Sequence, residues 1–182
     1  MINFKIYYNN LLDKFIELGY SEEIEWQRNL KPCDNDFNFM KETCWVILNS
    51  GIKEQIARKI WIKIIDAWNN GKETSEVFNH KGKVSALNYI RKNYNKIYND
   101  YIISNDKIKF LQTIPYIGKI TCYHLAKNLG HDCVKPDRHL VRISNQFNMT
   151  PNELCEQISL ETGEKKSVID IVIWRSCNLK LI

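Results

Sequence analysis

Apolar residues recur at helical spacing along almost the whole chain, whereas the alternation of apolar and polar residues that marks strands is rare. The stretch Lys53–Trp68 shows the helical pattern most clearly, because its apolar side chains fall on one face. Other stretches with this spacing are Phe4–Leu18, Ser21 to before Pro32, Phe37–Leu48, Lys83–Ile97, Asp106–Thr113, Thr121–Leu129 and Lys165–Cys177. We therefore predict an all-α fold of about nine or ten helices.

Helix-capping residues support these boundaries. Asn35 and Asp36 precede one predicted helix, and Gly19 follows another. The segment Thr150-Pro151-Asn152-Glu153 is a capping box with proline in the first turn, and it predicts a helix that ends near Gly163. The polar stretch from residue 71 to residue 82 is expected to hold no more than one short helical turn.

A tight turn, Ile114–Lys119, separates two of the predicted helices. Pro115 ends the first helix because it disfavours the helical conformation for Ile114. Gly118 permits a positive φ and a close approach of another backbone, and Gly130 is a natural stop for the following helix. The pattern predicts a helix–hairpin–helix, although an ordinary αα-hairpin has the same turn residues.

A second feature follows shortly afterwards, in the segment Val134–His139. Pro136 and Asp137 lie at the start of a further predicted helix, where a carboxylate accepts hydrogen bonds from unpaired amides. Asp137 is thus either a helix cap alone or a cap that also performs chemistry.

Charge is unevenly distributed in this chain of 182 residues, whose net charge is +5. Between Lys81 and Arg142 the sequence has 12 basic and 4 acidic residues, a net charge of +8, while the rest carries −3. This distribution indicates a polyanionic partner, with a lysine-rich solvated surface as the alternative. The sequence has no apolar run long enough for a membrane span and no signal peptide pattern, so we expect a cytoplasmic protein.

The six cysteines contain no C-x-x-C pair. Cys122 with His124, and His131 with Cys133, are residue types that bind zinc, but Cys122 and His124 face opposite sides of a helix. We predict no metal or organic cofactor. The one ion we consider is a monovalent cation between the hairpin amides and a bound phosphate.

The stretch Leu111–Arg142 resembles the signature of the DNA glycosylase superfamily that includes endonuclease III and the alkyladenine glycosylases. That signature joins a helix–hairpin–helix to a Gly/Pro-Asp motif (HhH-GPD). The resemblance implies an all-α, two-lobed fold and gives Asp137 the place of the family's catalytic aspartate. It gives the turn and the nearby basic residues the DNA-binding places: Pro115, Tyr116, Ile117, Gly118, Lys119, Thr121, Arg138 and Arg142.

The chain departs from the family pattern at two positions of the turn. Tyr116 stands where many members have the first glycine of the hairpin. Ile120 stands where the bifunctional members have the lysine that forms a Schiff base, and Lys119 comes one place earlier. The first departure concerns the backbone geometry of the hairpin. The second favours a monofunctional glycosylase, in which water is the nucleophile.

The resemblance also implies a base pocket near the end of the predicted helix that contains Trp45. Asn49 and Ser50 are candidates for contact with a flipped base, and Trp45 and Trp26 are candidates for stacking on it. Core packing is the alternative role for both tryptophans.

Together these features predict a DNA glycosylase that flips a damaged or modified base from double-stranded DNA and hydrolyses its N-glycosidic bond. The alternatives are a DNA-binding module without chemistry and a bifunctional glycosylase/lyase. We expect a monomer made of a single HhH-GPD-like domain over residues 1–182. Its first lobe is expected to hold residues 1–35 and 143–182, and its second residues 36–142 with the hairpin at 111–130.

Overall fold

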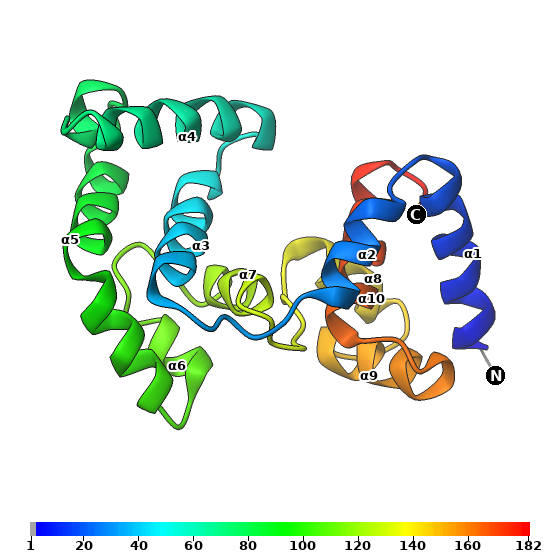
Figure 1. The fold of residues 1–182 in the computed structure, drawn as a ribbon. Coiled ribbons are helices and arrows are strands. Elements are labelled where there is room, and N and C mark those ends of the chain that lie inside the picture. Colours follow the sequence, from blue (N-terminus) through cyan, green and yellow to red (C-terminus); the bar gives the residue numbers. More distant parts are fainter. Residues whose placement is uncertain (1–2) are drawn as a thin grey trace. The chain divides into compact units, whose positions relative to one another are not determined.

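The computed structural model describes residues 3–182, and within this range the chain is all-helical, as the apolar spacing predicts. Contacts divide the chain into two compact units (Figure 1). The first unit holds the chain up to Pro32 and again from Gly130 to Ile182, and the second holds Cys33–Leu129. Within residues 3–182 every helix is too short or too polar to cross a lipid bilayer.

The second unit is built around a pair of helices, α3 and α5, which lie side by side (Figure 1). The ring of Phe39 on α3 lies 5.7 Å from that of Tyr98 and 5.0 Å from that of Tyr101, both on α5. The elements of this unit are α3 (Asp36–Asn49), α4 (Glu54–Asn69), the short 3₁₀-helix η1 (Thr74–Glu76), α5 (Lys81–Ile103), α6 (Lys107–Leu111) and α7 (Thr121–Asn128).

Within the described part of the first unit, five helices pack around one apolar core. Its elements are α1 (Phe4–Glu17), α2 (Ser21–Asn29), α8 (Arg138–Asn145), α9 (Pro151–Thr162) and α10 (Lys166–Asn178). Tyr8 and Phe15 of α1, Leu140 of α8, Ile158 of α9 and Val172 of α10 are all buried in this core. α10 is the most deeply buried of these helices, which explains its apolar sequence.

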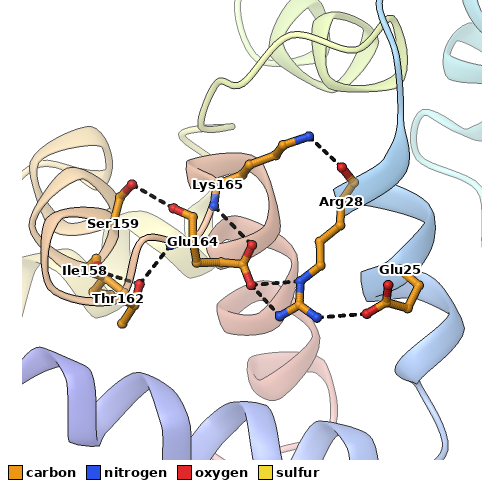
Figure 2. Close-up of polar contacts among 7 residues, drawn as sticks. All are labelled: Glu25, Arg28, Ile158, Ser159, Thr162, Glu164 and Lys165. Atoms are coloured by element: carbon orange, nitrogen blue, oxygen red, sulfur yellow. Dashed lines mark hydrogen bonds and ion pairs between the residues drawn. The ribbon is translucent and has the colours of Figure 1, made fainter.

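Polar contacts fasten α2 to the loop between α9 and α10 (Figure 2). The Arg28 guanidinium donates to Oε2 of Glu164 from Nε at 2.9 Å and from Nη2 at 2.5 Å. Lys165 Nζ donates to the carbonyl of Arg28, and Ser159 Oγ donates to the carbonyl of Glu164. The loop is therefore fixed both to α2, through Arg28, and to α9, through Ser159.

The division between the units falls between Leu129 and Gly130, whereas the sequence led us to expect it between residues 142 and 143. The reason is packing, because Leu140 and Ile143 of α8 are buried in the same core as α1, α9 and α10. Asp137 consequently belongs to the unit that contains the chain ends. Residues 1 and 2 of the expected first lobe lie outside the described residues.

Candidate functional site

The hairpin turn lies between α6 and α7 and is anchored by two buried isoleucines. Ile114 and Ile117 are each 4% exposed, and the amide of Ile117 donates to the carbonyl of Ile114 at 3.0 Å. Pro115, Gly118 and Lys119 between and after them are exposed. The turn therefore presents backbone and a cation to solvent while its apolar side chains hold it in place.

The start of α7 leaves several amides available. Gly118 N–H donates to Thr121 Oγ1 at 2.7 Å, and Cys122 N–H donates to the carbonyl of Gly118 at 3.0 Å. Among residues 3–182, the amides of Lys119, Ile120 and Thr121 donate to no acceptor. Unpaired amides at the first turn of a helix are the groups that bind phosphate oxygens.

Tyr116 adopts a positive φ of 71° in this turn. This left-handed conformation favours glycine and is uncommon for a tyrosine. The departure noted in the sequence therefore falls at a backbone position with the conformational requirement of glycine, and the chain meets that requirement with a bulky residue.

Asp137 is the N-cap of α8, as the Pro-Asp pattern predicts. Its Oδ1 accepts hydrogen bonds from the amides of His139 at 2.9 Å and Leu140 at 3.2 Å. Its Oδ2 lies 3.8 Å from the ammonium of Lys135, and the side chain is 13% exposed. One carboxylate oxygen is thus used by the helix, while the other belongs to an ion pair.

The two predicted arginines lie one helical turn apart on α8 and are both exposed. Arg142 also has partners within the first unit, since its Nη2 donates to the carbonyl of Ile182 at 3.2 Å and to Cys177 Sγ at 3.4 Å. Burial raises the pKa of Cys177, and the nearby Arg142 opposes that rise. The role of Arg138 and Arg142 in DNA binding stays a prediction.

The predicted base-pocket residues divide between the two units. Trp45 and Asn49 lie one turn apart on α3 and are half-buried, and Ser50 caps the same helix. Arg58 of α4 covers the Trp45 ring at 5.6 Å from its centroid. Trp26 lies on α2 in the first unit and is 47% exposed. Stacking on a base stays a prediction for both tryptophans.

A hollow of about 490 Å³ on the first unit contains none of the predicted site residues. It is lined by Asn148, Met149, Asn152, Glu153, Glu156 and Gln157. Its two carboxylates make it a poor surface for a nucleic-acid backbone, so we do not assign it to the candidate site.

Lys83 is one of the basic residues between Lys81 and Arg142, and its side chain is buried in the second unit. It is 2% exposed, and its Nζ donates to the carbonyls of Leu48 at 2.6 Å and Ser50 at 2.5 Å. Burial lowers the pKa of Lys83. The helical spacing contained the signal, because Lys83 shares a face with the apolar Leu87 and Ile90.

Asp170 is a second buried charged residue, and the sequence pattern did not indicate it. It lies on α10, is 2% exposed, and accepts a hydrogen bond from the amide of Lys135 at 2.5 Å. Asp132 lies in the loop itself, and its Oδ1 accepts a hydrogen bond from the amide of Ser167 on α10 at 2.8 Å. These contacts fasten the loop that precedes Asp137 to α10.

No protein-family model matches the sequence, and a search of curated proteins finds no match either. Among solved structures, the chain is similar to the crystal structure of Methanocaldococcus jannaschii 8-oxoguanine glycosylase/lyase in complex with a 15mer DNA containing 8-oxoguanine. The TM-score is 0.68 at 18% sequence identity, and the likeness covers 95% of this chain and 98% of that one. The chain therefore has an all-α fold of the HhH-GPD glycosylase type.

Proposed function

We propose that this protein is a DNA glycosylase that flips a damaged or modified base out of double-stranded DNA and hydrolyses its N-glycosidic bond. The observation that carries the proposal is the likeness in fold, over 95% of the chain, to a glycosylase/lyase crystallised on lesion-containing DNA. The exposed hairpin amides and the basic segment around them support DNA binding.

Asp137 is the proposed catalytic carboxylate. As the bond between the base and C1′ breaks, its electron pair leaves with the base and positive charge develops on the sugar. A carboxylate beside C1′ stabilises that charge and accepts a proton from the attacking water, whose oxygen forms the new bond to C1′. Since Oδ1 is held by the amides of α8, the carboxylate has a fixed orientation.

The proposed reaction is monofunctional, with water as the nucleophile. Ile120 stands at the position that is a lysine in bifunctional members, and its side chain carries no amine. Lys119 is exposed beside the unpaired amides and is assigned to a DNA phosphate. The remaining site residues are proposed as the DNA-binding and base-pocket groups that the resemblance implies.

The test is base release from a panel of duplex oligonucleotides, each with one alkylated, oxidised or hypermodified base, detected by mass spectrometry. The wild-type protein should release at least one free base, and Asp137→Asn should bind the same duplex while its rate falls by about a hundredfold or more. Release by the variant at the wild-type rate would remove Asp137 from the mechanism. Binding without release of any base would favour the non-enzymatic DNA-binding module.

A further inference from the structure

Three aromatic rings lie together where the start of α5 meets the hairpin turn. The rings of Phe78 and His80 are stacked, with centroids 6.2 Å apart and an interplanar angle of 21°. The Tyr116 ring meets His80 edge to face at 6.0 Å and 85°. His80 is exposed, Tyr116 is 42% exposed and Phe78 is half-buried, so this aromatic cluster reaches the surface.

The position of Tyr116 in the cluster has a conformational cost. Its φ of 71° disfavours any side chain, and glycine would relieve the strain. The ring lies close to Gly82 on α5, because a Cβ at that position would lie 3.2 Å from Tyr116 Cε2. Strained backbone conformations that the surrounding structure maintains are often found at functional sites. At Tyr116 the strained backbone places a half-exposed ring at the tip of the turn.

His80 has a defined hydrogen-bonding state in the cluster. Its Nδ1 accepts a hydrogen bond from the amide of Lys83 at 3.3 Å and thereby caps α5. A neutral imidazole with an accepting Nδ1 carries its proton on Nε2, so the exposed residue has an N–H donor to offer. The Lys83 ammonium lies over the Tyr116 ring, 5.8 Å from its centroid, so a buried cation packs beside the cluster.

We propose that the aromatic cluster of Phe78, His80 and Tyr116 is a second DNA contact beside the hairpin amides. In this proposal the Tyr116 ring packs against a deoxyribose of the DNA strand that the hairpin amides bind, and His80 Nε2–H donates to an adjacent phosphate. We expect DNA to bind at this cluster because of its location. Tyr116 belongs to the hairpin turn, which also contains the exposed Lys119, and the exposed Lys81 comes directly after His80. The inference rests on the proposed DNA binding and goes beyond it by assigning roles to side chains.

The test measures affinity for an undamaged duplex, which requires no base release, together with thermal stability. Tyr116→Gly removes the ring and relieves the positive φ, so its melting temperature should equal or exceed that of the wild type while its affinity falls about fivefold or more. His80→Asn removes the imidazole but keeps a good cap for α5, and it should weaken binding without loss of stability. Tyr89→Ala, which removes a 47% exposed tyrosine elsewhere on α5, is the matched control.

The possible outcomes separate the inference from the proposed function. Failure of the wild-type protein to bind the duplex would overturn both. Wild-type affinity in both cluster variants would overturn the aromatic contact and leave the proposed function standing. If both variants bound DNA more weakly and also melted at a lower temperature than the wild type, the aromatic contact would likewise be overturned, since the rings would then serve the fold alone.

Discussion

The backbone N–H of His139 donates a 2.9 Å hydrogen bond to Oδ1 of Asp137, and this contact closes the first turn of α8. The same carboxylate is thus both a structural cap and the proposed catalytic group. The two roles respond differently to substitution, because a cap requires only an acceptor oxygen whereas the chemistry requires a carboxylate.

Comparison of Asp137→Asn with Asp137→Ala separates these roles. Asparagine caps a helix about as well as aspartate, so Asp137→Asn should unfold within about 0.5 kcal/mol of the wild type. Alanine removes the acceptor and should lower the free energy of unfolding by about 1 kcal/mol. Both should lose base release. Urea denaturation measures the first effect, and equal stabilities of the two variants would contradict the capping contact.

Lys119→Ala tests the hairpin as a phosphate-binding site. Lys119 is exposed, so the variant should keep wild-type stability. If the ammonium neutralises one phosphate, the slope of log affinity against log salt should become shallower by about 0.9, with similar losses for all DNA sequences. Lys63→Ala, which removes an exposed lysine from α4, is the control and should leave the slope unchanged. An unchanged slope for Lys119→Ala would argue against the contact.

The helices were predictable because their signals are local. The segment that forms α4 has its buried residues Ala57, Ile64 and Trp68 at helical spacing, and Thr150 and Glu153 form the capping box that opens α9. Asp137 caps α8 for the same local reason. In each case the residues that decide the structure lie within a few positions of one another.

The remaining features depend on residues distant in sequence. Helical spacing places Lys83 on the same face as Leu87 and Ile90, but its hydrogen-bond partners, the carbonyls of Leu48 and Ser50, belong to a distant segment that no local pattern identifies. Tyr116 keeps a positive φ that its own side chain disfavours. The division between the units differs from the expected one because it depends on which core α8 joins, and the apolar face of a short helix does not specify its partner.

Gly130 is a position where a side chain has no room. It has a φ of +88°, and a Cβ there would lie 2.4 Å from the carbonyl oxygen of Lys31. Gly130→Ala should therefore lower the free energy of unfolding by about 3 kcal/mol or more, from left-handed strain and steric overlap combined. Gly163→Ala is the matched control, because Gly163 has a φ of +75° but a Cβ there would meet no atom beyond its chain neighbours within 4 Å, and it should cost only about 1 kcal/mol. Equal losses would show that overlap with Lys31 has no effect.

The contact between Arg28 and Glu164 should stabilise the first unit. Hydrogen bonding to Glu164 is the largest cause of the raised pKa of Arg28, and the Glu164 side chain is only 13% exposed. Glu164→Gln should lower the free energy of unfolding by about 1–2 kcal/mol, because charge-assisted hydrogen bonds become neutral ones. Glu25, whose side chain is 59% exposed, binds the same guanidinium at 2.8 Å. Glu25→Gln should change stability by less than about 0.5 kcal/mol, and a larger loss there than at Glu164 would contradict this assignment.

Tyr7 should make the protein less stable at alkaline pH. Burial raises the pKa of Tyr7 from 10.0 to about 12; Cys177 adds to the rise and Arg142 opposes it. The folded chain therefore holds the phenolic proton more tightly than the unfolded chain does. The resulting stability is complete below about pH 10 and is lost as the pH rises from about 10 towards 12.

The measurement is the free energy of unfolding in urea at several pH values between about 9 and 11.5. Tyr7→Phe keeps the ring that packs 5.5 Å from Phe147 but has no proton to lose. Its stability should therefore decline less steeply with pH than that of the wild type, while the exposed Tyr89→Phe should follow the wild-type slope. Parallel declines in the wild type and Tyr7→Phe would mean that other groups govern alkaline unfolding, with the buried Tyr8, whose pKa is also raised by burial, as the next residue to substitute.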